Sequence, residues 1–545
     1  MPRVYLETFG CQMNELDSEL VLGQLRALGY STCDDPAAAD AVLYNTCSVR
    51  EHAEQKVWSR LGELTADKKR RPGLVVGVLG CLAERDGLDL LRRLPVVDIL
   101  CGPGELDRLP SLLDNALRTN LSRAGDEASA VRSARQVALQ GNASRRSATL
   151  AAAADSLELL DLSRAVSPDD HAGSAYVRIT RGCNKFCTYC VVPFTRGAEV
   201  HRPPDHIVDE CRRLADAGIV EVTLLGQTVN HYRFEHAAAV MLDGVIQPQK
   251  GRAFTGGHRR DPLSGGRVTT FADLLRRIHD EVPAIRRLRF VTSYPRDFGD
   301  DALEAIRDCP RICRYLHVPA QSGSDRILRA MNRGYTVAEY EDFIARARAM
   351  LHRPDEGRPL MVSSDFIVGF PGETDDDFRE TMALVERARF KNAFIFKYSP
   401  RPGTTAYDRL ADDVPDDVKR HRNNVLLALQ TRLSDEISRE QVGREFDVLV
   451  QGVSRREAKR RARVALTVGG HAPREEAAPA QLSARTDADQ IVLFDAPRGE
   501  PAEGWIGRIV RVRITRADRL SLHAEPSVSA AGDAGERGPA GARGC

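Results

Sequence analysis

The feature that most constrains the fold is a regular alternation of short apolar runs with amphipathic segments between about residues 172 and 442. Strands that alternate with helices along a chain favour a parallel sheet, because each helix carries the chain back to the start of the next strand. Six such repeats predict a partial (β/α)6 barrel of the TIM type. A stretch rich in Gly, Arg and Ala over 234–270 predicts a surface insertion within it. The apolar runs are AYVRIT, EVTLLGQ, RLRFVTS, RYLHVPA, MVSSDFIVGF and NAFIFKYS.

The first block, residues 1–118, also alternates apolar runs with helical patterns, which predicts an N-terminal Rossmann-like α/β domain. Each of its three strand patterns ends at a cysteine, namely Cys11, Cys47 or Cys81. In an open α/β sheet the carboxyl ends of the strands line the ligand crevice. We therefore expect these three thiols to converge on one rim, although any one of them alone reads as a buried apolar thiol.

Three further segments complete the predicted organisation. Residues 119–170 are rich in Ala, Ser and Arg and are predicted to be a linker or insertion. Residues 443–525 carry short alternating patterns broken by Gly and Pro, which predict a small antiparallel β-barrel. Residues 526–545 are predicted to be a disordered tail.

Composition limits the cellular setting. A chain of 545 residues is long enough for three or four folding units. No export-signal pattern opens it, and its longest apolar stretch, around 73–83, is about half a membrane span, so we expect a cytoplasmic protein without a membrane anchor. Twelve cysteines are too dilute for a disulfide scaffold and are expected to be reduced. Clustered cysteines in such a chain indicate metal binding.

The strongest local signal is the loop RITRGCNKFCTYCVVPFTRG, in which Cys183, Cys187 and Cys190 are spaced C-x3-C-x2-C directly after a strand pattern. A structural zinc site takes four protein ligands, and iron–sulfur clusters are usually held by four cysteines. Three thiolates favour a [4Fe–4S] cluster with one iron left open for a substrate or cofactor. The alternatives are a zinc knuckle that borrows a fourth ligand, or three buried thiols.

This loop at the start of a βα-repeat block resembles that of the radical S-adenosylmethionine superfamily. The two cysteine trios and the small C-terminal barrel together resemble the methylthiotransferases of the MiaB type, whose C-terminal domain is the RNA-binding TRAM domain. The segments that carry the resemblance are TFGCQMNELDSE, NTCSVRE, LLGQTVNHYR, QSGSDRILRAMNRGYT and SSDFIVGFPGET. Departures from the family pattern are the long insertions and Thr228, where Asn is common.

The resemblance implies addition of a methylthio group to C2 of N6-isopentenyladenosine next to the tRNA anticodon. It implies two [4Fe–4S] clusters, one on Cys183, Cys187 and Cys190 and one on the N-terminal trio. Two S-adenosylmethionine molecules would be used, one as methyl donor and one as radical source. A reductase or flavodoxin-type electron donor and a monomeric enzyme are expected.

Five further residues are candidates for contacts to S-adenosylmethionine. Each has an alternative interpretation as a strand-end polar group satisfied by backbone, or as part of an ordinary turn. The basic runs 419–422 and 455–463 are candidates for contacts to tRNA phosphates, whereas His231 and His236 show no metal-binding pattern. The five cofactor candidates are Gln227, Asn230, Ser364, Asp365 and Gly369.

Two other functions remain open from the sequence. The chain can be a methylthiotransferase for another substrate, such as threonylcarbamoyladenosine in tRNA or a ribosomal protein. A non-catalytic iron–sulfur RNA-binding sensor would need no S-adenosylmethionine site, so the six barrel repeats and the open cluster iron argue against it.

Overall fold

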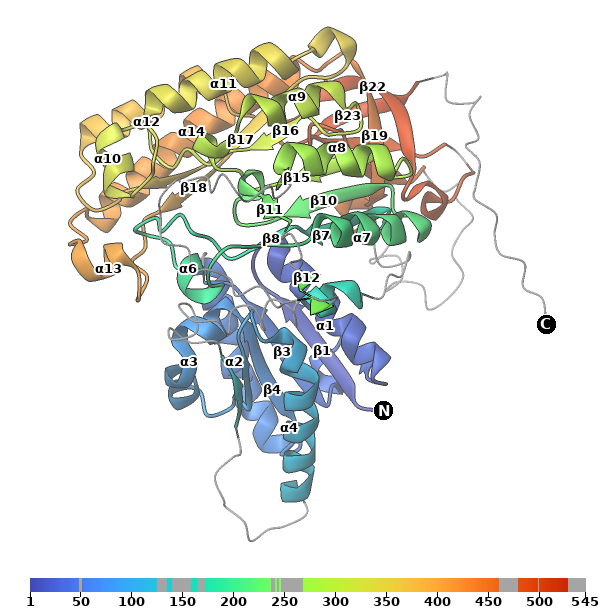
Figure 1. Ribbon diagram of the computed structural model, residues 1–545, viewed down its shortest axis with the longest axis vertical. Helices are drawn as coiled ribbons and strands as arrows, with labels where there is room; N and C mark the ends of the chain where they lie inside the picture. Colours follow the sequence, from blue (N-terminus) through green and yellow to red (C-terminus); the bar gives the residue numbers. More distant parts are fainter. Residues whose placement is uncertain are drawn as a thin grey trace.

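The computed structural model describes residues 1–48, 51–124, 135–139, 158–164, 172–236, 241–242, 245–246, 268–459, 479–497 and 499–527. Figure 1 shows an N-terminal α/β unit (blue), a larger unit of strands and helices (green to orange) and a small β-barrel beside the larger unit (red). In the ranges just given, no helix has the length and apolar character needed to span a membrane.

The N-terminal unit is built on a parallel sheet with strand order β2-β1-β3-β4-β5-β6. Every residue of β3 and β4 is buried, because apolar helix faces cover both sides of the sheet. This confirms the predicted α/β layering. The strands are β1 Arg3–Thr8, β2 Ser31–Thr32, β3 Ala41–Thr46, β4 Val75–Gly80, β5 Ile99–Cys101 and β6 Gln136–Ala138; α1 Gln12–Ala27 and α4 Leu109–Ala124 cover one face, and α2 Glu51–Arg70 and α3 Cys81–Arg93 the other.

Strand β6 lies inside the segment 119–170 that the sequence predicts as a linker or insertion. It pairs in parallel with β5 and becomes an edge strand of the sheet. Residues 158–164 form a short helical turn in which Leu160, Asp161 and Arg164 are buried. At these two places the segment is part of the fold, and the sequence missed it because such short pieces carry little periodicity. Its other residues lie outside the described ranges.

The second unit has six parallel strands in two three-stranded sheets, β15-β10-β7 and β16-β17-β18. A bridge between Leu288 and Ile312 connects the two halves, so the strands follow one another as in the predicted partial barrel. The strands are β7 Ser174–Arg178, β10 Glu221–Leu225, β15 Arg287–Phe290, β16 Tyr315–His317, β17 Met361–Val368 and β18 Asn392–Lys397.

Helices surround these strands and complete the unit. The longer ones are α7 Pro204–Asp216, α8 Phe271–Glu281, α9 Asp300–Asp308, α11 Val337–Leu351, α12 Asp375–Ala388 and α14 Asp416–Arg439; the shorter ones are α6 Val192–Thr195, α10 Asp325–Ala330 and α13 Thr405–Arg409. The predicted insertion 234–270 is closed at its base by β11 Arg233–Glu235, paired with β14 Val268–Thr270. Two residue pairs within it form β12 Met241–Leu242 and β13 Val245–Ile246, and its remaining residues from 237 to 267 lie outside the described ranges. A hairpin of β8 Thr180–Arg181 and β9 Val200–His201 flanks the cysteine loop.

The third unit is a closed barrel of strand order β19-β20-β21-β23-β22. Its pairing is antiparallel except between β21 and β23, which run parallel. Arg287 and Arg289 of β15 are buried and donate to main-chain carbonyls of this barrel at Arg485 and Asp487, over 2.8 Å in each case. The barrel therefore docks at the amino ends of the second unit's strands. The strands are β19 Glu445–Val453, β20 Gln481–Arg485, β21 Ile491–Asp495, β22 Ile509–Ala517 and β23 Leu522–Pro526, and the tail beyond residue 527 lies outside the described ranges.

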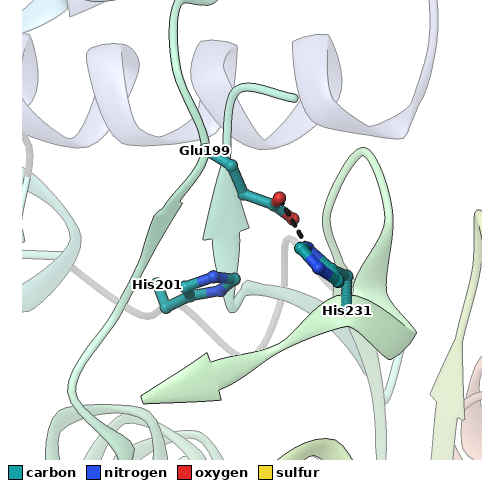
Figure 2. Close-up of side chains that lie close together, drawn as sticks. All are labelled: Glu199, His201 and His231. Atoms are coloured by element: carbon teal, nitrogen blue, oxygen red, sulfur yellow. Dashed lines mark hydrogen bonds and ion pairs between the residues drawn. The ribbon is translucent and has the colours of Figure 1, made fainter. Parts of the chain in front are cut away.

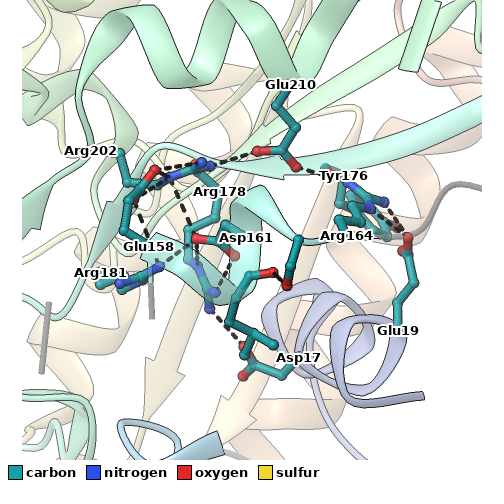
Figure 3. A network of polar contacts seen from close by, with 12 residues as sticks. Asp17, Glu19, Glu158, Asp161, Arg164, Tyr176, Arg178, Arg181, Arg202 and Glu210 are labelled. Atoms are coloured by element: carbon teal, nitrogen blue, oxygen red, sulfur yellow. Dashed lines mark hydrogen bonds and ion pairs between the residues drawn. The ribbon is translucent and has the colours of Figure 1, made fainter. Parts of the chain in front are cut away.

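A buried network of ion pairs joins the first two units (Figure 3). Arg178 of β7 donates to Asp17 of α1 over 2.7 Å and to Asp161 over 2.5 Å. Arg196, which follows α6, donates to the other oxygen of Asp17 over 2.9 Å. Five acids face five arginines in this network, so its formal charges balance: Asp17, Glu19, Glu158, Asp161 and Glu210 with Arg164, Arg178, Arg181, Arg196 and Arg202.

Asp161 is the centre of the network. Burial by itself would raise the pKa of Asp161, but the charges of Arg178, Arg181 and Arg202 outweigh it, and the pKa lies below its usual range. The carboxylate is therefore ionised at neutral pH although it is almost fully buried. It holds three arginines in place at the junction of the two units.

Asp161→Asn keeps the side-chain shape but leaves buried arginines without their shared negative charge. Removing one partner of a buried ion pair costs about 3–5 kcal/mol. We expect the variant to lower the free energy of unfolding in urea at neutral pH by about 3 kcal/mol or more. Asp376→Asn is the matched control, because its ion pair with Arg379 is exposed, and it should cost less than about 1 kcal/mol.

The pH dependence of stability in the parent protein and in Asp161→Asn tests the lowered pKa of Asp161. Because the folded-state pKa is lowered, the stabilisation is complete above the unfolded-state pKa of about 3.9 and is lost as the pH falls from there toward the folded-state value. The stability gap between the parent and Asp161→Asn should therefore shrink below about pH 4. A gap that stays constant on acidification would contradict an ionised Asp161.

Candidate metal centre

A cavity of about 890 Å³ opens where the N-terminal unit meets the carboxyl ends of the barrel strands, and it extends to the third unit. Five of the six predicted cysteine ligands line it, and the sixth, Cys81, lies buried just off the lining. Thus the structure brings together two cysteine trios that the sequence separates by about a hundred residues. The lining cysteines are Cys11, Cys47, Cys183, Cys187 and Cys190.

The loop trio follows β8 and turns on a glycine. Gly182 has φ of +69°, and a Cβ there would lie 2.1 Å from the carbonyl oxygen of Ala198, so only glycine fits. The amide of Cys183 donates to Gly197 and that of Cys190 to Cys187, which closes the loop on itself. Local sequence therefore folds the three thiols into one compact turn.

The spacing of the sulfurs tests which metal the trio suits. Two thiolates on one tetrahedral zinc ion are roughly 3.8 Å apart. Among the described residues, the only trio of metal-binding side chains with all ligand atoms within 4.8 Å of one another contains no cysteine. At least one pair of the loop sulfurs therefore lies more than 4.8 Å apart, and this spacing suits a polynuclear cluster in which each thiolate binds a different iron.

The N-terminal trio is placed by the ends of three strands. Cys11 precedes α1, Cys47 follows β3 and Cys81 begins α3 directly after β4. Gly10 allows the first two to approach, because a Cβ at Gly10 would lie 2.7 Å from the Cβ of Cys47. Cys81 lies near Cys11 and near Thr195 and Arg196 of the second unit.

Two buried arginines, which the sequence analysis did not identify, place positive charge beside the thiols. Arg333 donates from Nη1 to the Sγ of Cys187 over 3.3 Å. Arg196 lies beside Cys11 and Cys81 while it binds Asp17. The available signal was their place in two quoted motifs: Arg333 stands in MNRGYT, a segment that carries the family resemblance, and Arg196 stands in FTRG at the end of the cysteine loop.

Burial governs the acid–base behaviour of three of the six thiols. It raises the pKa of Cys183 to about 11 and also raises the pKa of Cys81 and Cys190. These groups are protonated at neutral pH in the protein alone, so iron must displace their protons on binding. Buried and half-buried thiols grouped in threes beside fixed cations are a donor set that fits anionic iron–sulfur clusters.

The five residues predicted to contact S-adenosylmethionine divide into two groups. Gln227 and Asp365 line the cavity. Asn230 instead exchanges two hydrogen bonds of 2.8 Å with the backbone of Tyr294, and the Oγ of Ser364 accepts from the amide of Ala320 over 2.9 Å. The amide of Gly369 donates to Glu373 over 2.6 Å, and these three residues lie off the lining.

Part of the cavity wall is aromatic and cationic. Phe394 of β18 is 48% exposed although it lies inside the cavity, with the ring of His317 against it at 6.2 Å. Arg485 and Arg519 of the third unit line the same cavity. An exposed aromatic ring and cations are the groups that bind nucleotides by stacking and by phosphate contact.

The basic run 419–422 differs from its expected role. Lys419 binds Asp412 over 2.5 Å and Arg422 binds Glu373 over 2.7 Å, and both side chains are buried at the start of α14. Only Arg420 and His421 of this run face solvent. In the second run, Arg455, Arg456 and Lys459 are exposed, and residues 460–463 lie outside the described ranges.

Three family models match the chain in the order of its units. They are "Uncharacterized protein family UPF0004" over residues 3–102, the Radical SAM superfamily over 177–385 and the TRAM domain over 473–526. The second match means that the barrel unit uses S-adenosylmethionine and a [4Fe–4S] cluster. A solved radical S-adenosylmethionine methyltransferase, TsrM from Kitasatospora setae, covers 83% of this chain and 79% of its own at 14% identity and a TM-score of 0.47, too weak a likeness to carry functional information.

Curated relatives match over almost the whole chain. The tRNA-2-methylthio-N(6)-dimethylallyladenosine synthase of Rhodopirellula baltica is 43% identical over 95% of this chain and 94% of its own. Proteins of the same name from Burkholderia cenocepacia and Bacteroides fragilis are each 38% identical, over 96% of this chain and 96% and 95% of their own. The chain belongs to the family of tRNA-2-methylthio-N(6)-dimethylallyladenosine synthases.

Proposed function

We propose that this chain adds a methylthio group to C2 of N6-isopentenyladenosine next to the anticodon of tRNA. C2 of adenine is an unactivated sp² carbon without an acidic proton, so general acid–base catalysis does not reach it, whereas a carbon radical does. One observation carries the proposal: cysteines from two units border a single cavity of about 890 Å³.

Each cysteine trio is proposed to hold one [4Fe–4S] cluster with one iron free of protein ligands. Cys183, Cys187 and Cys190 would hold the first, and Cys11, Cys47 and Cys81 the second. When bound, the first cluster supplies the electron that cleaves S-adenosylmethionine to a 5′-deoxyadenosyl radical, and the second carries the sulfur to be inserted. The wide sulfur spacing and the buried arginines beside both trios support this assignment.

The two arginines are positioning residues for the clusters. Arg333 holds Cys187 by a hydrogen bond and is itself fixed by the carbonyl of Pro319 and the hydroxyl of Tyr335. Hydrogen bonds and positive charge at cluster sulfurs stabilise the reduced form. Arg196 does the same for the N-terminal trio, and it also joins the two units through Asp17.

For S-adenosylmethionine we propose direct contacts from Gln227 and Asp365, both of which line the cavity. Asp365 also lies 3.5 Å from the Nε2 of His317, and this contact limits the rotation of the carboxylate. Asn230, Ser364 and Gly369 are proposed to act indirectly, because their polar groups are engaged by neighbouring backbone or by Glu373. They fix the turns that follow the strands.

For the tRNA we propose that the target adenine leaves the anticodon-loop stack and enters the cavity, where Phe394 offers a stacking surface. Extrusion from a single-stranded loop costs only a few kcal/mol. Arg519 would meet the phosphates near the extruded nucleotide, whereas Arg485 is held in an ion pair with Asp489 over 2.8 Å. An external reductase or flavodoxin-type donor would supply electrons, and we expect the enzyme to act as a monomer in the cytoplasm, where its tRNA substrate is made.

Substitution of single cysteines distinguishes the roles of the two trios in the reaction. Cys187→Ser should abolish formation of 5′-deoxyadenosine by anaerobically reconstituted protein given S-adenosylmethionine and reductant. Cys47→Ser should retain 5′-deoxyadenosine but form no methylthio product, and each variant should lose about half of the bound iron. Cys33→Ser is the control, because Cys33 belongs to neither trio. Full iron content in Cys47→Ser would refute the second cluster.

Arg333→Met tests the role of the buried charge. Removing a cation beside Cys187 disfavours the more negative, reduced cluster, so the reduction potential should fall by about 60 mV or more, which for one electron is about 1.4 kcal/mol. A redox titration followed by electron paramagnetic resonance measures it. Arg329→Met, an exposed site nearby, should leave the potential unchanged. An unchanged potential in Arg333→Met would mean that the arginine only supports the fold.

The substrate is tested in cells of the source organism by deletion of the gene. We expect 2-methylthio-N6-isopentenyladenosine to disappear from hydrolysed tRNA and unmodified N6-isopentenyladenosine to accumulate, as measured by mass spectrometry of nucleosides. Complementation with the parent gene should restore the modification, and complementation with the Cys187→Ser gene should not. Loss of a different methylthio modification would assign the chain to another substrate.

A further inference from the structure

Glu199, His201 and His231 form a compact cluster outside the cysteine trios (Figure 2). Their ligand atoms all lie within 4.8 Å of one another, and no other group of this kind occurs among the described residues. Glu199 and His201 are two residues apart along an extended segment that ends in β9, so their side chains point to the same side. His231 comes from the 3-10 turn Val229–His231 after β10.

Hydrogen bonding within the cluster leaves one potential ligand atom, the Nδ1 of His201, without a partner among the described residues. The Nδ1 of His231 lies 2.7 Å from Glu199, which satisfies both of those groups. The Nδ1 of His201 is buried and has no hydrogen-bond partner within the described protein. A cation placed between the three groups would satisfy this nitrogen.

The surroundings have the features of a metal site. The Glu199 side chain is 1% exposed, and Thr228 donates to its second oxygen over 3.0 Å, as outer groups orient a ligating carboxylate. The nearby cation Lys185 is neutralised by its ion pair with Asp297. His231 is 41% exposed, which leaves one side of the cluster open to solvent.

We propose that Glu199, His201 and His231 bind one zinc ion. Two histidines and one glutamate are an established zinc ligand set, and an exposed face leaves the fourth position for water. The ion would tie β9, which follows the cysteine loop, to the turn after β10, and so hold Thr228 and the neighbouring Gln227 against the cavity wall. This site stands on its own residues and does not depend on the proposed reaction.

Zinc uptake by the cluster-loaded enzyme tests the proposal. The anaerobic protein is dialysed against zinc and desalted, and its metals are counted by mass spectrometry. We expect about one zinc per chain in the parent and in the control His236→Ala, and none in His201→Ala/His231→Ala, with iron content equal in all three. Equal zinc in the parent and the double variant, or no zinc in the parent, would overturn the site.

Two further measurements guard against misfolding and against zinc on cysteines. Glu199→Gln keeps the side-chain shape and should weaken zinc binding by roughly tenfold or more, as should Thr228→Val through the lost orienting bond. Cobalt in place of zinc should give visible absorption that both variants reduce, without a sulfur-to-cobalt charge-transfer band. A sulfur-to-cobalt charge-transfer band with an intensity that corresponds to one cobalt per chain would place the ion on the cysteines and refute the proposal.

Discussion

The arrangement of the molecule depends on the buried carboxylates of Asp17 and Asp161 and the arginines that share them. Asp17 belongs to the N-terminal unit, and Arg178 and Arg196 that bind it belong to the barrel unit. Because most groups in this network are buried and need their partners, the two units have one favourable relative orientation. That orientation brings Cys11 and Cys47 to the same cavity as the loop cysteines.

The network also connects docking to chemistry, because Arg196 takes part in both. One of its contacts is to Asp17, and its charge lies beside Cys11 and Cys81. A purely apolar interface of the same size would hold the units together without placing a cation at these thiols. The charged junction therefore does more than hold the two units together, because it places a cation beside the thiols. Buried ion pairs by themselves contribute little net stability, since burying their charges is costly.

One short segment of the second unit serves several sites at once. Residues 183–202 carry the loop cysteines, Arg196, Glu199, His201 and Arg202. Within it, the β8–β9 pairing holds the two ends of the loop together, and Arg202 binds Glu158 and Glu210 of the buried network. Binding of a cluster, docking of the N-terminal unit and the proposed zinc site therefore act on the same stretch of backbone.

The sequence by itself determined the order of the three units, the six-strand barrel and the close grouping of Cys183, Cys187 and Cys190, since apolar periodicity and close cysteine spacing are local properties of a chain. Only the tertiary structure decided what distant residues do to one another. It engages Asn230 with the backbone of Tyr294, buries Lys419 and Arg422 in ion pairs, adds β6 to the first sheet and brings Arg333 to Cys187. It also unites His231 with Glu199 and His201, although no metal-binding spacing links them. Such contacts depend on where strand ends and turns from separate repeats meet, and the pattern of one segment carries no information about the position of another.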